Sequence, residues 1–321
     1  QWGLVNSVGK VLINPLYDDI QSVAKGLYRV QVGSKANAVG RIVGGQWGLV
    51  DSLGKVIIKA QYDALFRASK CCYWVQGGGK RNDEGDILGG KWGLIDSLEN
   101  VVVKPQYDAI QNASKNLYWV QVEGEPNKDG YIKGGKWGLA DSQGKVVLQP
   151  QYHDILSAPN GFLTVNIGGK LNNGGNVVGG QWGLVDSLGK VVIQPQYDVI
   201  EPTLRGLYLV QEGGKPNDNG YLVGGQWGLL DSLGKVVIKP QYDNIQIDQK
   251  GWYRIQFGGK LSDEGYLLDG KWGLLDNLGK LVVKPQYDHV QQSSKGLYRV
   301  NVGGELNIDD YIAGGQWGLL D

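Results

Sequence analysis

Residues 226–245 read QWGLLDSLGKVVIKPQYDNI, and close copies of this stretch recur along the whole chain. The Trp-Gly pair within it returns every 45 residues, with no insertion or deletion. Its tryptophans are Trp2, Trp47, Trp92, Trp137, Trp182, Trp227, Trp272 and Trp317. A fixed period of this kind indicates a repeat architecture. The seven repeats are 1–45, 46–90, 91–135, 136–180, 181–225, 226–270 and 271–315, and 316–321 begin a partial eighth.

Each repeat predicts four short strands, which we name A to D. Their segments are β-branched or aromatic and end at Gly or Pro. Representative copies are strand A at 242–245, B at 207–211, C at 181–186 and D at 190–195. Strands C and D join through the tight hairpin DSLGK, in which Gly189 can adopt a positive φ. The third repeat has Glu99-Asn100 in place of Gly-Lys, and we expect the tolerance of Asn for left-handed geometry to preserve the hairpin.

Apolar runs such as 191–193 (VVI) predict sheets that are buried on both faces. An open stack and a closed ring both satisfy this requirement. We expect the ring, because wedges of constant length close at one angle, whereas a stack tolerates insertions and has polar end caps. The predicted fold is all-β: a seven-bladed β-propeller of four-stranded antiparallel blades, forming a single domain over 1–321.

The repeats begin at strand C, so the blades are out of phase with them. The last blade would take strands A and B from 286–305 and strand D from 10–15. Its strand C would come from 316–321 or from 1–6, which are nearly identical. We therefore expect strands from both ends to share one blade and close the ring, with the spare copy displaced or paired with a neighbouring molecule.

Composition argues against several classes of partner. Lys plus Arg and Asp plus Glu number 32 each, so we expect neither nucleic acid nor a membrane surface as a partner. Two cysteines cannot form a disulfide framework. No apolar run approaches the roughly 18 residues of a membrane span, and no leader is evident. The segment starts at Gln1 and lacks Met, so we interpret it as a soluble piece of a longer polypeptide whose compartment is undetermined.

The tandem motif WGL(I/V)D–xxGKVVI–PxYDxI resembles the WG-repeat (WG β-repeat) family, which is largely bacterial. The resemblance covers the whole chain and rests on eight aligned Trp-Gly copies. It implies a β-propeller or β-repeat architecture and no common activity. This chain departs from the family pattern in a longer B–C connection, KxNDxGYLVGG.

The unusual residues suggest no catalytic or metal site. His153 and His289 lie in different repeats without a partner at metal-ligand spacing, and we interpret them as ordinary substitutions. Cys71-Cys72 replaces the usual Gly-Leu. These two residues are reduced thiols, one filling the Leu pocket, or alternatively a strained vicinal disulfide or redox pair. We expect no cofactor and no enzyme activity.

Two repeated motifs have a structural and a functional interpretation. The Trp-Gly pairs are a blade core in which Gly lets an adjacent blade approach, or alternatively a platform on which sugars stack. In the Tyr-Asp pairs, such as Tyr242-Asp243, the Asp accepts amide hydrogen bonds in the crossover between strands D and A and the Tyr packs between blades, or alternatively the carboxylates form a ring that binds a cation. We favour the structural interpretation of both.

The polar tips of the B–C connections are the candidate binding rim. Its residues are Asn82, Asp83, Asn127, Asp129, Asn172, Asn217, Asp218, Asp263 and Asn307. These residue types are equally suited to simple β-turns. We expect a monomeric, non-catalytic scaffold that binds another protein through this loop-bearing face. The alternatives are a multivalent lectin that also uses Trp74, Trp119 and Trp252, and a structural repeat domain with no ligand of its own.

Overall fold

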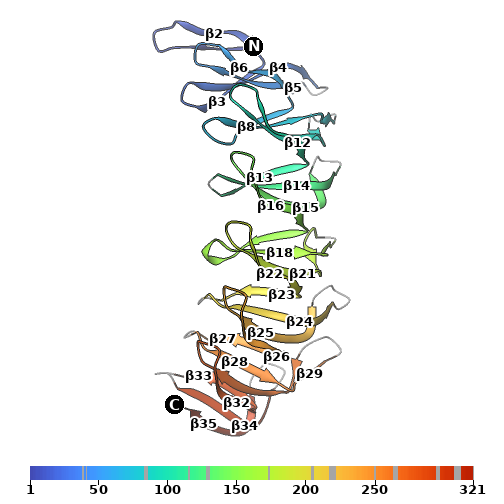
Figure 1. Ribbon diagram of the computed structural model, residues 1–321, viewed down its shortest axis with the longest axis vertical. Helices are drawn as coiled ribbons and strands as arrows, with labels where there is room; N and C mark the ends of the chain where they lie inside the picture. The colour runs from blue at the N-terminus through green and yellow to red at the C-terminus, as the bar shows by residue number, and fades with distance from the viewer. Residues whose placement is uncertain are drawn as a thin grey trace. The chain divides into compact units, whose positions relative to one another are not determined.

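The computed structural model describes residues 1–37, 40, 42–82, 86–114, 116–127, 131–172, 174–203, 206–216, 222–248, 251–262, 267–293, 297–306 and 312–320. The chain divides into two compact units, Gln1–Tyr152 and His153–Asp321. Within the described residues, each unit holds three complete four-stranded antiparallel sheets and one incomplete sheet (Figure 1).

The strands of each complete sheet follow the order A-B-C-D along the chain. Strand A is β3 (Asp19–Ala24), β7 (Ala64–Arg67), β13 (Ala109–Ser114), β17 (Asp154–Ser157), β23 (Val199–Pro202), β27 (Asn244–Ile247) and β33 (His289–Gln292). Strand B is β4 (Leu27–Ala36), β8 (Cys72–Gly77), β14 (Leu117–Pro126), β18 (Leu163–Ile167), β24 (Tyr208–Pro216), β28 (Tyr253–Phe257) and β34 (Tyr298–Leu306). Strand C is β1 (Trp2–Val5), β5 (Ile42–Asp51), β11 (Lys91–Asp96), β15 (Ile132–Asp141), β21 (Gln181–Val185), β25 (Leu222–Leu230), β31 (Lys271–Leu275) and β35 (Ile312–Leu320). Strand D is β2 (Val11–Tyr17), β6 (Val56–Tyr62), β12 (Val101–Tyr107), β16 (Val146–Tyr152), β22 (Val191–Tyr197), β26 (Val236–Tyr242) and β32 (Leu281–Tyr287).

The B–C connections extend the sheets as hairpins. In some repeats strands B and C continue into the hairpin, as in β4 and β5. In three others the hairpin is a separate strand pair: β9 (Lys80–Arg81) with β10 (Ile87–Leu88), β19 (Lys170–Leu171) with β20 (Val177–Val178), and β29 (Lys260–Leu261) with β30 (Leu267–Leu268). The described residues contain a single 3-10 turn, η1 (Pro159–Gly161), and no α-helix. The four-stranded antiparallel design predicted from the sequence is confirmed.

The hydrophobic core lies between successive sheets rather than within one. Leu49 and Ile58 of the sheet β3–β6 pack with Leu65, Tyr73 and Ile95 of the next sheet. The unit His153–Asp321 has the same kind of core between sheets, since Leu184 packs with Tyr208 of the following sheet. The interior sheets are therefore buried on both faces, as the apolar runs predict. Removing such a side chain has a typical cost of about 2–5 kcal/mol.

The tryptophans of the Trp-Gly motif pack against the core as predicted, but its glycine has a different role: Trp272 is buried, and Trp47, Trp92, Trp182 and Trp227 are partly buried against core clusters. The leucine two residues after each Trp is the core residue in the complete sheets, and Leu49 and Leu94 are fully buried. Most of the tryptophans are only half-buried, and in the incomplete sheets Trp2 is 64% exposed and Trp317 47% exposed. The glycine accommodates strand D of its own sheet, because a Cβ at Gly48 would lie 2.6 Å from the Ile58 carbonyl oxygen. The expectation that Gly admits an adjacent blade was therefore wrong.

The C–D hairpin forms in every repeat, with one correction. In the third repeat Glu99, not Asn100, occupies the glycine position and has a φ of 63°. Its carboxylate accepts a hydrogen bond of 2.7 Å from the Lys59 backbone N–H in the preceding repeat. This contact offsets part of the cost of left-handed geometry, which is roughly 1–2 kcal/mol for a residue with a Cβ.

The sheets at the two ends are incomplete. Strand β35 pairs with β34 in a three-stranded sheet, and β1 pairs with β2 in a two-stranded sheet. Residues 10–15, predicted to supply strand D of the last blade, pair with Trp2–Val5, which is one of the two copies of strand C that the sequence offered. The sharing of one blade by strands from both ends, and the count of seven closed blades, are not confirmed and stay predictions.

Candidate functional site

Three residues of the predicted rim, Asn82, Asn127 and Asn172, lie in the described part of the chain, and all three close turns. The Asn172 side-chain oxygen accepts backbone N–H bonds from Gly174 (2.9 Å) and Asn176 (3.0 Å). That of Asn127 accepts from Tyr131 (2.9 Å), and that of Asn82 from Asp86 (2.8 Å). Asp83, Asp129, Asn217, Asp218, Asp263 and Asn307 lie outside the described residues. The binding role of the rim stays a prediction, but these three oxygens serve their own hairpins.

The aspartates of the Tyr-Asp pairs hold the base of the B–C hairpin. Asp63 accepts the Gly79 N–H at 2.9 Å, and His153, which replaces the aspartate in the fourth repeat, accepts the Gly168 N–H through Nδ1 at 3.1 Å. The equivalent aspartates that accept such a bond are Asp18, Asp108, Asp198, Asp243 and Asp288. The predicted hydrogen-bonding role is confirmed, although the donors lie in the B–C hairpin and not between strands D and A.

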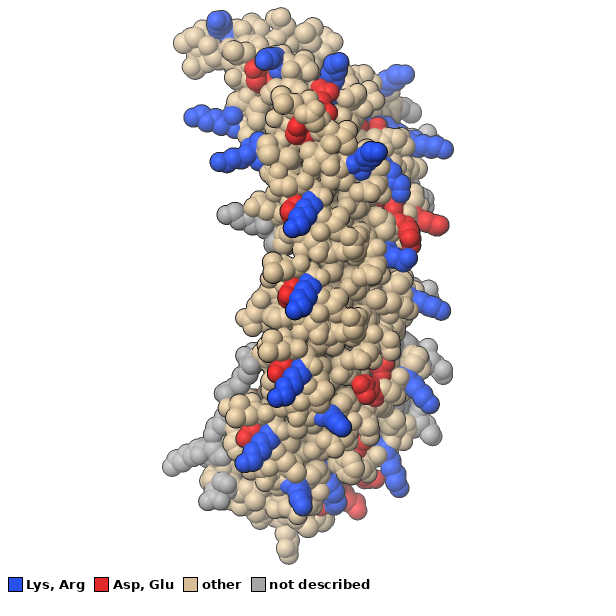
Figure 2. Space-filling model, viewed as in Figure 1, with Lys and Arg blue, Asp and Glu red and all other residues tan. Residues whose placement is uncertain are grey.

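Lysines at the start of strand C neutralise some of these carboxylates. Lys91 pairs with Asp108, and Lys271 pairs with Asp288. Burial would raise the pKa of Asp288, but hydrogen bonds from Lys271 and the Gly303 N–H outweigh it and lower that pKa. Where His153 replaces the aspartate, Lys136 pairs with Glu123 at 2.8 Å instead. Acidic and basic side chains are accordingly interspersed on the visible face of each unit (Figure 2).

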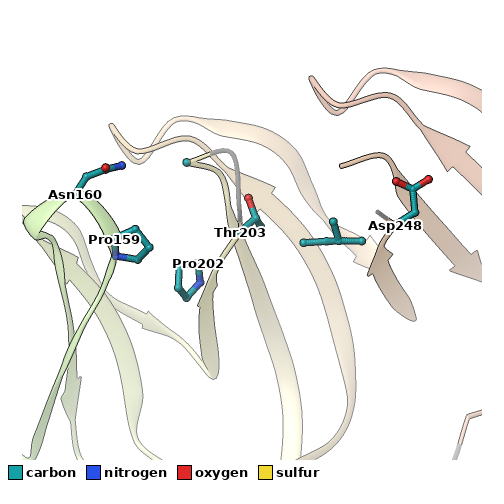
Figure 3. A pocket seen from close by; sticks show the side chains of 7 residues that line it. Pro159, Asn160, Pro202, Thr203 and Asp248 are labelled. Atoms are coloured by element: carbon teal, nitrogen blue, oxygen red, sulfur yellow. The ribbon is translucent and has the colours of Figure 1, made fainter. Parts of the chain in front are cut away.

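A hollow opens along the A–B loops of the unit His153–Asp321, and we call it the A–B hollow. Its volume is about 570 Å³. It is lined by Pro159, Asn160, Pro202, Thr203, Gly206, Ile247 and Asp248. These residues come from three successive repeats, so their side chains lie in a row across neighbouring sheets (Figure 3). Its volume falls within the range of about 300–1,000 Å³ typical of ligand pockets.

Thr203 is the most informative residue of the A–B hollow. It is only 6% exposed, and its hydroxyl oxygen is buried without a hydrogen-bond partner among the described residues. Its backbone N–H donates to the Leu207 carbonyl at 2.8 Å. An unsatisfied buried hydroxyl costs about 1–3 kcal/mol and is uncommon in folded proteins.

A second hollow of about 390 Å³ continues the first, sharing Ile247 and Asp248 with it. Its other lining residues are Arg254, Gln291, Gln292 and Ser293. The Asp248 carboxylate accepts hydrogen bonds from the Tyr298 hydroxyl and from the Trp252 N–H. Burial, then the hydrogen bond and negative charge of Asp248, raises the pKa of Tyr298 well above its usual range.

Arg254 supplies a positive charge to this second hollow. Its two terminal nitrogens donate to the Val290 carbonyl (3.0 Å) and to the Gln246 side chain (2.7 Å). Its Nε is buried, and no described residue accepts a hydrogen bond from it. Burial lowers the pKa of Arg254, and the charge of Asp248 opposes that shift. The two hollows together therefore offer an acceptor, a hydroxyl and a guanidinium N–H.

The family is identified by the repeats themselves. The model of the WG containing repeat matches 2–35, 47–80, 92–125, 137–170, 182–215, 227–260 and 272–305. The chain belongs to this family. No curated protein matches it.

Solved structures resemble the WG-repeat chain only weakly. A eukaryotic initiation factor has 12% sequence identity and a TM-score of 0.29, with 99% of this chain and 94% of that chain covered. For an acylaminoacyl peptidase from Pyrococcus horikoshii the identity is 10% and the TM-score 0.29, with 95% and 51% covered. For the tricorn protease they are 12% and 0.28, with 92% and 29% covered. The WG-repeat chain thus spans about half of that peptidase and less of the tricorn protease.

The tryptophans of the lectin alternative and the second histidine lie in largely buried surroundings. Trp74, which the lectin alternative would use to contact a sugar, is fully buried, while Trp119 and Trp252 are half-buried. Burial, then the charges of Arg254 and Arg299, lowers the pKa of His289. In the described residues no three His, Cys, Asp or Glu side chains group as a metal site would require. The described residues also contain no helix with the length and hydrophobicity that crossing a membrane requires.

The A–B hollow was missed, although the sequence carries a signal for it. The segment between strand A and the next Gly-Leu-Tyr is where the repeats diverge most. Pro159, Pro202, Thr203 and Asp248 all lie in this segment and interrupt an otherwise regular pattern. The sequence shows that these residues depart from the consensus, but it does not show that they lie beside one cavity.

Proposed function

We propose that this WG-repeat chain is a monomeric, non-catalytic scaffold that binds an extended segment of another protein along the A–B hollow. The observation that supports the proposal most is the hollow itself, where three successive loops of one unit surround a buried hydroxyl without a partner. A repeat scaffold presents such loops in register, so that a linear ligand meets one loop after another. Binding elements are commonly loops held by a rigid framework.

An extended polypeptide suits the chemistry of this surface. Such a segment presents N–H and C=O groups at regular intervals, and side chains on alternate sides. The Thr203 hydroxyl and the Arg254 Nε can donate to its carbonyl groups, and the Thr203 oxygen can accept from an N–H. The prolines at 159 and 202 add apolar surface without a side-chain polar group. Pairing the buried hydroxyl with a ligand would remove an existing penalty.

Selection of peptides from a random display library on the intact chain tests this proposal. Pro202→Trp fills the hollow from an exposed position, and Leu233→Trp adds the same bulk on an exposed hairpin of the same unit. Selected peptides should lose binding to the first variant and keep it with the second. Thr203→Val preserves shape while removing the hydroxyl, and should weaken binding about 5–10-fold, as expected for one hydrogen bond of about 1–1.4 kcal/mol.

Three results would contradict the proposal. One is a set of peptides that bind Pro202→Trp and the parent equally. Another is loss of binding on replacing Asn82, Asn127 and Asn172 with Ala, which would move the site to the predicted rim. The third is saturable binding on a glycan array without peptide binding, which would favour the lectin alternative.

The closed circle of seven blades is a further, separate proposal about architecture. Its support is the burial of interior sheets on both faces and the constant repeat length. In a circle, Leu319 of β35 would take the place of Leu4 opposite Ile13 of β2, as Leu274 lies opposite Val283 in a complete sheet, and β1 would be the displaced copy of strand C. A compact chain of this length has a radius of gyration of about 20 Å. Small-angle X-ray scattering that gives a much larger value would exclude the circle.

A further inference from the structure

The A–B loop of the second repeat differs from its equivalents in the other repeats. At the position of Cys71, five described repeats have a residue with positive φ, and Cys71 does not. These residues are Gly26, Asn116, Gly161, Gly206 and Gly251. Ser69 organises the loop instead, because its hydroxyl oxygen accepts N–H bonds from Cys71 (3.4 Å) and Cys72 (3.2 Å).

This loop brings two thiols together. The Sγ atoms of Cys71 and Cys72 are 3.4 Å apart, and the Ser69 hydroxyl lies 3.6 Å from the Cys71 sulfur. Cys71 is exposed, whereas Cys72 is 3% exposed and belongs to a core cluster with Trp74 and Leu94. Hydrogen bonds from Ser69 and then Cys72 lower the pKa of Cys71. Burial, then the hydrogen bond to Cys71, raises the pKa of Cys72.

The spacing of the sulfurs suits a bridging atom better than a direct bond. Consecutive α-carbons across a trans peptide are about 3.8 Å apart, below the range of about 4.4–6.8 Å found in disulfides. With bonds of about 2.3 Å, the length of a zinc–thiolate bond, sulfurs 3.4 Å apart subtend about 95° at the atom that they share. That angle is smaller than the tetrahedral angle and suits a pyramidal, three-coordinate centre.

We propose that Cys71 and Cys72 form a binding site for trivalent arsenic. The exposed Cys71 thiolate bonds first to arsenic and displaces one hydroxide, which leaves as water with the thiol proton. Cys72 then closes the ring and releases a second water, so that As(OH)₃ and two thiols give (RS)₂As–OH and two H₂O. Arsenic stays in the trivalent state, and no oxidant is needed. The third ligand remains on arsenic, so the protein supplies only two sulfurs.

A zinc site is disfavoured by the same geometry. Structural zinc requires four protein ligands in a tetrahedron. Among the described residues no group of three or more His, Cys, Asp or Glu side chains is positioned to bind a metal. A centre that carries its own third ligand therefore matches the two thiols, and zinc does not.

Phenylarsine oxide added to the reduced, intact chain is the test, with native mass spectrometry and competition by a monothiol as readouts. We expect one phenylarsenic per chain and the loss of both free thiols. Cys71→Ser and Cys72→Ser should each weaken binding at least about 100-fold, because the second bond is no longer intramolecular. The double variant Cys71→Gly/Cys72→Leu restores the residues found at 206–207 and should fold without binding.

Ser69→Ala keeps both thiols and tests the loop. We expect slower adduct formation at neutral pH and a rate profile displaced to higher pH, because the Cys71 thiolate loses its hydrogen-bond donor. Three results would overturn the proposal: equal affinity in Cys72→Ser, no adduct while both thiols react with a thiol reagent, or a reduced sample that closes to a disulfide before arsenic binds. Circular dichroism of each variant separates a lost site from a lost fold.

Discussion

Two hairpins of the unit His153–Asp321 share one set of hydrogen bonds in different surroundings. In the C–D hairpin of the seventh repeat, the Asp276 side chain accepts N–H bonds from Leu278 and Lys280, both at 2.9 Å. In the B–C tip of the fourth repeat, Asn172 accepts from the residues two and four positions later, at 2.9 and 3.0 Å. In both turns the N–H three residues after the capping residue donates to its carbonyl.

The difference between these hairpins lies in what surrounds the glycine. Gly279 is buried, and a Cβ there would lie 2.6 Å from Cγ1 of Val237 in the preceding repeat. Gly175 is exposed, and no atom of the described residues would lie within 4 Å of its Cβ. Both have a φ of about 80°. The hydrogen bonds of the turn thus depend on nearby residues only, whereas the packing of the turn depends on the preceding repeat. Because the Asn or Asp side chain is used by its own turn, its presence there is no evidence of a ligand.

The largest expected effect comes from adding one methyl group to each glycine. Gly175→Ala should lower the free energy of unfolding by about 1–2 kcal/mol, the cost of left-handed geometry alone. Gly279→Ala has the same cost and also crowds Val237, so we expect the free energy of unfolding to fall by about 2–5 kcal/mol. Urea unfolding of both variants and the parent measures the difference. Equal losses would mean that the C–D hairpin is not packed against the preceding repeat.

A smaller effect is expected from removing the capping side chains. Asp276→Ala removes a charged acceptor from two backbone N–H groups, and should destabilise the chain by about 1–2 kcal/mol. Asn172→Ala removes a neutral acceptor from the corresponding groups, and should cost less than about 1 kcal/mol, because hydrogen bonds to uncharged groups are weaker. Asp276→Asn keeps the acceptor oxygen and is the matched control. A larger loss in Asn172→Ala would reverse the comparison.

Much of the fold was predictable because it depends on short-range patterns. The Trp-Gly period predicted the repeats, and the Asp-Ser-Leu-Gly-Lys segment predicted the C–D hairpin with glycine at positive φ. The role of the Trp-Gly glycine was not predicted, because it depends on how closely strand D approaches within its own sheet. The same limit applies to Trp74, whose burial is decided by the neighbouring Tyr107 and Tyr118 rings.

The candidate site was less predictable than the fold. Thr203 and Asp248 share a cavity only because consecutive repeats place their A–B loops side by side. The rim residues looked like ligands because Asn and Asp are common in both turns and binding sites. Sequence alone does not report which of these oxygens are already occupied. The hydrogen bonds of Asn82, Asn127 and Asn172 supply that information.

The smallest expected effect concerns charge at the capping position. Hydrogen bonds from Asn100, opposed by slight desolvation and aided by backbone N–H groups, lower the pKa of Asp96. A carboxyl with a depressed folded-state pKa adds stability above its unfolded pKa, near 3.9, and that stability is lost as the pH falls through the folded value. Asp96→Asn removes this dependence while keeping the turn, since Asn6 already accepts the equivalent N–H bonds from Val8 and Lys10 in the first repeat. Urea midpoints measured from pH 7 down to pH 3 should fall slightly less in the variant than in the parent. If the urea midpoints of variant and parent fall in parallel, the negative charge of Asp96 contributes nothing to stability, and the neutral amide and the carboxylate are equivalent caps.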